Sequence, residues 1–266
     1  MVFFKKIVDW YIDSSLHVAL AAYALIRLTF LWLNTSYDDS VAGFGFFGTI
    51  VAYNCIKYYR VISFDTKFYG FVCSITILSF FASIYYYIQL QMASQIVICI
   101  AFLITLLYTF SFFGILKPAR NWIGFKIFLV AISWSLITFW LPVVPSIGKL
   151  TLDIFLLGIQ RFVLVYALMC VFEIVDLQFD AVSLKTLPQR IGVKRTKQLG
   201  FALLLFFLFI EIIIQKKVCL IDLLFVVLIA VFLFFSKRNS SKYYSNFWVE
   251  SIPILWWLAY LVAIYF

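Results

Sequence analysis

Residues 172–192 read Phe-Glu-Ile-Val-Asp-Leu-Gln-Phe-Asp-Ala-Val-Ser-Leu-Lys-Thr-Leu-Pro-Gln-Arg-Ile-Gly and close a long apolar run that starts near residue 152. Glu173, Asp176 and Asp180 follow at spacings of three and four, so on a helix they share one face. Carboxylates at the C-terminal end of a helix meet its partial negative charge and also repel one another. This acidic stripe therefore needs a compensating positive charge.

Two sources could supply that positive charge. One is a divalent cation bound by the carboxylates. The other is the basic segment that follows, whose side chains would pair with the acids and leave no metal site. Its members are Lys185, Arg190, Lys194, Arg195 and Lys197.

Composition sets the fold class. Hydrophobic residues make up 65% of the 266 residues and charged ones 12%, with a mean hydropathy of +1.07. Soluble domains are about 45–50% apolar and about 25% charged. Apolar runs of roughly 20 residues, enough to span a bilayer, recur along the whole chain. We therefore expect an all-α polytopic membrane protein, and we read the +9 net charge as a topology signal, with no nucleic-acid partner.

The apolar runs predict nine spans, at 14–33, 42–59, 68–89, 94–114, 123–142, 152–172, 198–215, 218–236 and 247–265. With this count, sixteen Lys and Arg residues fall on the side of the N-terminus. Lys149, Lys216 and Lys217 fall on the other side, and Arg27 and Arg161 lie within spans, which accounts for all 21. The positive-inside rule then predicts a cytoplasmic N-terminus and a cytoplasmic acidic stripe, in a multi-pass protein of the cell (plasma or inner) membrane.

The end of the second span holds a second candidate group. Asn54, Lys57 and Arg60 recur every three residues, at the same topological position as the acidic stripe. An interfacial belt is an equally good interpretation, with Tyr58 and Tyr59 at headgroup level and the basic side chains near lipid phosphates.

The acidic stripe, followed by Lys185-Thr186-Leu187-Pro188 and Ile191-Gly192, resembles the second aspartate-rich motif of the UbiA superfamily of intramembrane prenyltransferases. The nine spans are similar to the topology of that family, and Lys117-Pro118-Ala119-Arg120 is similar to its basic loop between helices four and five. The resemblance extends over residues 1–266 as one domain. The chain departs from the family's first motif, since only Asn54 is kept and Cys55, Tyr58 and Ile62 stand where aspartates are expected.

The resemblance implies a Mg²⁺-dependent enzyme that moves a prenyl group from an isoprenyl diphosphate to a membrane-accessible aromatic or lipid-precursor acceptor. It implies metal ligation by Glu173, Asp176 and Asp180, and catalytic roles for Asp176, Asp180 and Asn54. Basic side chains that we expect at the diphosphate are Lys57, Arg60, Lys117, Arg120 and Lys185. Aromatic side chains that could stabilise an allylic cation are Tyr53, Tyr108, Trp134 and Tyr166.

Two other functions stay open. The degenerate first motif also suits an inactive UbiA-like protein that binds an isoprenoid. Arg27, Arg161 and the acidic stripe could instead form the ion path of a small transporter, although transporter sites tend to lie near the midplane of the membrane.

Overall fold

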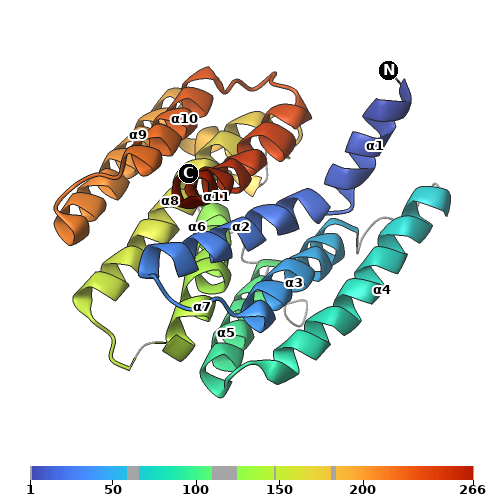
Figure 1. Cartoon of the computed structure of the whole chain (residues 1–266). Helices are drawn as coiled ribbons and strands as arrows, with labels where there is room; N and C mark the ends of the chain where they lie inside the picture. The colour runs from blue at the N-terminus through green and yellow to red at the C-terminus, as the bar shows by residue number, and fades with distance from the viewer. Residues whose placement is uncertain (1, 59–65, 110–124, 147, 181–183, 266) are drawn as a thin grey trace.

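A computed structural model of the chain describes residues 2–58, 66–109, 125–146, 148–180 and 184–265 (Figure 1). The described residues are helical with no strand, and the all-α fold class is confirmed. The α-helices are α1 (Val2–Asp13), α2 (Leu16–Leu33), α3 (Asp39–Tyr58), α4 (Thr66–Gln89), α5 (Met92–Thr109), α6 (Phe125–Ser135), α7 (Leu141–Val143), α8 (Leu152–Asp176), α9 (Leu187–Gln215), α10 (Leu220–Phe235) and α11 (Glu250–Tyr265). Short π-helical and 3-10 turns are η3 (Leu136–Trp140), η4 (Val144–Ser146) and η6 (Tyr244–Val249).

Seven described segments are long and apolar enough to cross a membrane: 16–33, 68–89, 92–109, 125–146, 152–176, 187–215 and 244–264. The helix α10 is apolar but shorter. The helix α3 begins at Asp39 and carries Asn54 and Lys57 near its other end, and it is not among the seven. Adding α3 and α10 would give nine spans, so the count of nine stays a prediction, as does the side on which the N-terminus lies.

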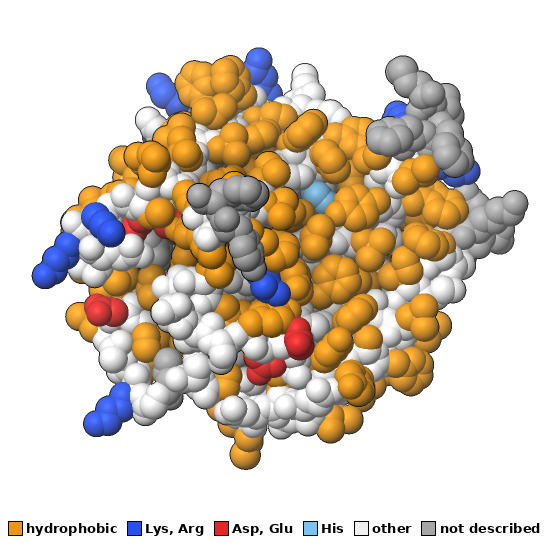
Figure 2. Space-filling model, viewed as in Figure 1, with side chains coloured by type: hydrophobic (Ala, Val, Ile, Leu, Met, Phe, Trp, Pro, Cys, Tyr) orange, Lys and Arg blue, Asp and Glu red, His pale blue; other side chains and the backbone are white. Residues whose placement is uncertain are grey.

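The exterior of the bundle is apolar. On α4, Leu78 is 69% exposed and Ile88 is 71% exposed, and hydrophobic side chains cover most of the face in Figure 2. Water does not tolerate such a continuous apolar surface on a monomeric protein, whereas lipid does. Together with the seven apolar helices, this shows an integral multi-pass membrane protein.

The helix α2 is the centre of the bundle. Its residues Leu25 and Leu28 pack into a core with α8, α9, α10 and α11. Its residues Ile26 and Phe30 pack into a second core with α3, α5 and α7. Because α2 has two buried faces, 61% of its span is buried, against 17% for α4.

A buried arginine ties α8 to α2. Arg161 is fully buried, and its Nη1 donates to the carbonyl oxygens of Leu25 at 3.0 Å and of Thr138 at 3.1 Å. Its Nη2 donates to Oγ1 of Thr29 at 3.0 Å. Thr138 lies in the π-helical turn η3, where the widened backbone leaves a carbonyl group open to partners outside the helix. Arg161 thus binds backbone oxygens and forms no ion pair with any described acid.

The helix α1 was not expected from the apolar runs. It lies at the end of the bundle that also carries the C-terminal end of α8. Lys57 at the end of α3 pairs with Asp13 of α1 at 3.2 Å. The hydroxyl of Tyr243, before η6, donates to Asp9 of α1, and this bond raises the pKa of Tyr243 to about 12. The helix α1 therefore connects α3 to the segment that precedes α11.

Candidate functional site

The three acids of the stripe come together at the end of α8. This helix begins at a Thr151 cap and runs for 25 residues to Asp176. A turn follows, in which the amide of Asp180 donates to the carbonyl oxygen of Asp176 at 2.8 Å. Asp180 is thus folded back over the last helical turn. Glu173 is 1% exposed, while Asp176 and Asp180 are half-buried.

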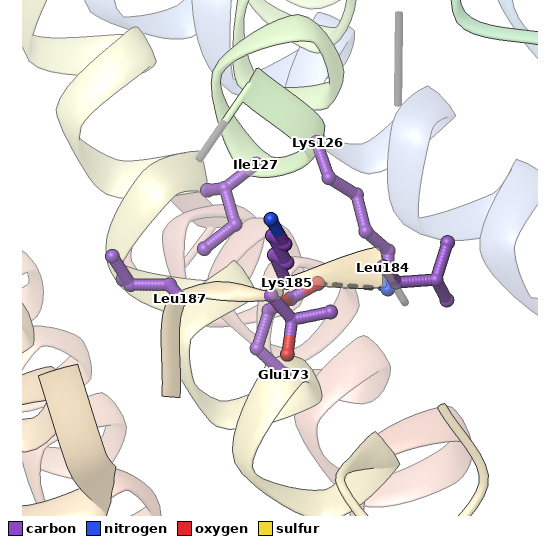
Figure 3. A pocket seen from close by; sticks show the side chains of 7 residues that line it. Lys126, Ile127, Glu173, Leu184, Lys185 and Leu187 are labelled. Atoms are coloured by element: carbon purple, nitrogen blue, oxygen red, sulfur yellow. Dashed lines mark ion pairs between the residues drawn. The ribbon is translucent and has the colours of Figure 1, made fainter. Parts of the chain in front are cut away.

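A lysine from another helix compensates two of these acids. Lys126, in the first turn of α6, lies with Nζ 2.8 Å from Oε1 of Glu173 and 3.0 Å from Oδ2 of Asp180. Figure 3 shows its side chain reaching from α6 to Glu173. Among the described residues, neither Lys185 nor the basic side chains of 190–197 form an ion pair with the stripe. The stripe is therefore compensated in part by a lysine, which is not one of those considered from the sequence.

Asp176 takes no part in these ion pairs. Its carboxylate forms no ion pair or side-chain hydrogen bond with any described residue. It lies within electrostatic range of Lys126 and Lys242, and also of Glu173 and Asp180. The middle acid of the stripe is thus the one whose oxygens remain available to a ligand.

A small crevice lies beside these residues. It is too narrow to hold a water molecule, and its lining residues come from α6, α8 and the segment that leads into α9 (Figure 3). They are Lys126, Ile127, Glu173, Leu184, Lys185, Thr186 and Leu187. Lys185 is exposed with a φ of 48°, and at the start of α9 the amide of Thr186 donates to Oε1 of Gln189 at 3.0 Å. Lys185 is therefore the expected diphosphate residue that the structure places next to the acids.

The residues expected on α3 do not contact the stripe. Asn54 is buried; its Oδ1 accepts from Ser15 at 2.7 Å, and its Nδ2 donates to Thr76 at 2.9 Å. Lys57 pairs with Asp13, as described above. Asn54 thus connects α3 to α2 and α4, and its catalytic role stays a prediction. Arg60, Lys117 and Arg120 lie outside the described residues, so their expected roles stay predictions too.

Glu250 is a candidate residue that sequence reasoning missed. It is the first residue of α11, directly after the π-helical turn η6, and it is half-buried. It lies within electrostatic range of both Lys57 and Asp176. Burial and, second, the negative charge of Glu250 raise the pKa of the Tyr11 hydroxyl on α1. An acid on the last helix therefore lies near both the end of α3 and the end of α8.

The aromatic candidates lie near the acids. The indole N–H of Trp134 donates to the hydroxyl of Tyr53 at 2.9 Å. The two rings are arranged edge-on, with their centres 6.3 Å apart. Tyr108 lies within electrostatic range of Tyr53 and of Lys126. Tyr166 lies within electrostatic range of Glu173. These rings therefore come from α3, α5, α6 and α8 toward one region of the bundle.

The carboxylates of the acidic stripe are the groups that could bind Mg²⁺. The described residues hold no group of three or more His, Cys, Asp or Glu side chains placed to bind a metal. Magnesium is, however, commonly held by one or two carboxylates together with substrate phosphates. Asp176, which has no partner among the described residues, and Asp180, whose Oδ2 pairs with Lys126 while its Oδ1 does not, meet this smaller requirement. Glu173 also pairs with Lys126 and is 1% exposed, so it is less open to a ligand.

Comparisons with known proteins bear on the fold. No family model matches the chain, and no curated protein matches it. Among solved structures, it is similar to a UbiA homologue from Archaeoglobus fulgidus bound to GPP and Mg²⁺. The TM-score is 0.63 at 12% sequence identity, over 97% of this chain and 100% of the homologue. The chain is therefore an integral membrane protein with a UbiA-like fold.

Proposed function

We propose that the protein binds an isoprenyl diphosphate at the end of the bundle where α6, α8 and α11 meet, and transfers the prenyl group to a membrane-accessible acceptor. One observation carries the proposal: at the end of α8, Lys126 of α6 pairs with Glu173 and Asp180, while the carboxylate of Asp176 has no partner among the described residues. The likeness to a fold that holds GPP and Mg²⁺ supports it.

In this reaction the bond between the allylic carbon and the diphosphate oxygen breaks, pyrophosphate leaves, and the acceptor forms a bond to the prenyl carbon and loses a proton. Bound Mg²⁺ would neutralise the charge that develops on pyrophosphate. Asp176 and Asp180 would hold the ion, with Glu173 as an outer group. Lys126 keeps Glu173 and Asp180 in place through its two ion pairs.

Basic side chains would bind the diphosphate itself. Lys185 lines the crevice beside the acids, and Lys57 lies within electrostatic range of Glu250, as Asp176 does. We include Arg60, Lys117 and Arg120 in this proposal on the sequence alone. The rings of Tyr53 and Trp134 would face the allylic cation, which a cation–π contact stabilises. Substrate would reach them from the bilayer.

The test measures release of pyrophosphate from a radiolabelled prenyl diphosphate by purified protein in nanodiscs with Mg²⁺. We expect Asp176→Asn to lower turnover by about 10²–10³-fold, as loss of one electrostatic contact to a transition state does. Lys57→Ala should mainly weaken diphosphate binding. The matched control is Asp153→Asn, an exposed acid at the other end of α8. Full turnover by a protein with both Asp176 and Asp180 changed to Ala would refute the proposal.

A specific observation favours a second function, that of a non-catalytic isoprenoid-binding protein. Lys126 occupies two acids of the stripe, and a fixed ammonium group can take the place of a metal ion beside a diphosphate. In that case the same assay would show binding of the prenyl diphosphate without turnover, and EDTA would leave binding unchanged.

A further inference from the structure

A second polar group lies toward the opposite end of the bundle from the acids. Arg27 of α2 is half-buried, with its Cζ 3.7 Å from the ring centre of Tyr37 in the α2–α3 connection. The ring centre of Trp257 on α11 is 5.3 Å away, and that of Tyr23 is 5.9 Å away. The guanidinium group is thus enclosed by aromatic rings from α2, α11 and the connection.

No carboxylate compensates this cation. Arg27 forms no ion pair with a described acid. It donates from Nη1 to the hydroxyl of Tyr23 at 3.3 Å, and that hydroxyl lies 3.2 Å from the hydroxyl of Tyr37. The nearby Asp38 instead accepts from the amides of Ser40 and Val41 and caps α3. A charge inside a membrane segment is costly and is normally paired, so this guanidinium group lacks an anion.

A further donor lies at the same place. The indole N–H of Trp257 is buried and has no acceptor among the described residues. Buried donors of this kind are nearly always satisfied in folded proteins. Two groups that need an acceptor, one charged and one neutral, therefore meet between α2 and α11.

The position of Arg27 along α2 suits contact with a lipid headgroup. Arg27 lies six residues before Leu33, the last residue of α2, or about 9 Å along the helix axis. An arginine side chain at that depth reaches the boundary between the hydrocarbon core and the headgroups. Guanidinium groups bind phosphate through parallel N–H donors.

We propose that Arg27, Tyr23, Tyr37 and Trp257 form a phosphate-binding site at this end of the bundle, separate from the acidic end. It takes a phosphate monoanion, either that of a phospholipid headgroup or free phosphate. The guanidinium edges not used by Tyr23 and the indole N–H donate to the phosphate oxygens, while the Tyr37 ring covers the guanidinium face. The proposal does not rest on the prenyltransferase function.

The test uses the delipidated full-length protein in neutral detergent and native mass spectrometry. Phosphatidylglycerol is titrated alone and then against inorganic phosphate. We expect Arg27→Gln to weaken lipid binding by about tenfold or more and Trp257→Phe, which keeps the ring, by about fivefold. Lys149→Gln is the control for general charge attraction, because Lys149 is an exposed cation on a loop at the same end. It should leave binding unchanged.

Competition with inorganic phosphate distinguishes a lipid headgroup from free phosphate as the ligand. Displacement of the lipid by millimolar phosphate supports a site for free phosphate, and resistance to it supports a lipid headgroup site. Equal binding by the wild type, Arg27→Gln and Trp257→Phe would overturn the proposal. If Arg27→Gln fails to fold, Arg27→Lys retains a charge without the planar fork, and it should still bind more weakly than the wild type.

Discussion

At the scale of single residues, Lys126 determines how many carboxylates of the acidic stripe are available to a ligand. Its side chain is 17% exposed and that of Glu173 is 1% exposed, so neither charge is well solvated. Removing one partner of such a pair leaves an uncompensated buried charge, which costs far more than losing a surface pair. The stripe therefore depends on α6 for its stability as well as for its charge.

We predict that Lys126→Met lowers the free energy of unfolding by about 3–5 kcal/mol. The double variant Lys126→Met with Glu173→Gln should recover much of this loss, because the glutamine carries no charge. Thermal unfolding in detergent measures both. The control is Lys57→Met, whose pair with Asp13 is 39% and 49% exposed and should contribute at most about 1 kcal/mol. Equal losses for the two lysines would contradict this prediction.

Part of the site could be predicted from local spacing. Glu173, Asp176 and Asp180 are neighbours along one helix, so their meeting follows from helical geometry alone. Lys126 and Glu250 are distant in sequence from them, and only the packing of α6 and of the turn η6 against α8 brings them close. One signal for Glu250 was present: a single acid within an apolar span marks a functional candidate in a membrane protein.

At the scale of elements, α9 contains a break that its apolar pattern does not reveal. Gly192 has φ 82° and ψ 156°, so the helix that starts at Leu187 is kinked at this residue. That backbone conformation is essentially restricted to glycine. The bend lets the segment 184–190 lie against the crevice while the rest of α9 packs along α8.

We predict that Gly192→Ala destabilises the protein by about 1–3 kcal/mol even though a Cβ there would meet no atom within 4 Å. Gly70→Ala is the matched control, because Gly70 also has open space but lies in a regular helix. That substitution should be neutral or stabilising by up to about 1 kcal/mol. Melting temperatures of the two variants give the comparison; a neutral Gly192→Ala would show that the bend is dispensable.

Most helices were predictable because apolar length alone defines them, and each expected span overlaps a described helix. The helix α1 was missed because its 12 residues are too short to span a bilayer. The π-helical turns were also missed. They follow from tertiary contacts, such as those of Thr138 with Thr29 and Arg161, which no local pattern encodes.

At the scale of the whole molecule, the distribution of basic residues predicts the orientation. Sixteen of the 21 Lys and Arg residues fall on the side of the acidic stripe if nine spans are counted. Basic residues that flank membrane helices are retained in the cytoplasm. The N-terminus and the stripe should therefore lie inside the cell, and Phe266 outside.

This orientation predicts that alkaline phosphatase fused after Phe266 is active in a bacterial host, while a fluorescent protein at the same point is dark. The same reporters fused after Ser240, in the connection between α10 and η6, should give the opposite pattern and serve as the control. Fluorescence from both fusion points would mean an even number of spans and would refute the count of nine.

The position of Glu250 affects whether a site of this kind can be recognised from a sequence. The UbiA motif expects carboxylates on the second span, and this sequence has none there. In three dimensions an acid from the last helix lies within electrostatic range of Lys57, at the end of that span, and of Asp176. A charge supplied from the far end of the polypeptide escapes any profile that compares residues in linear order, so a site completed in this way is visible only in the folded chain.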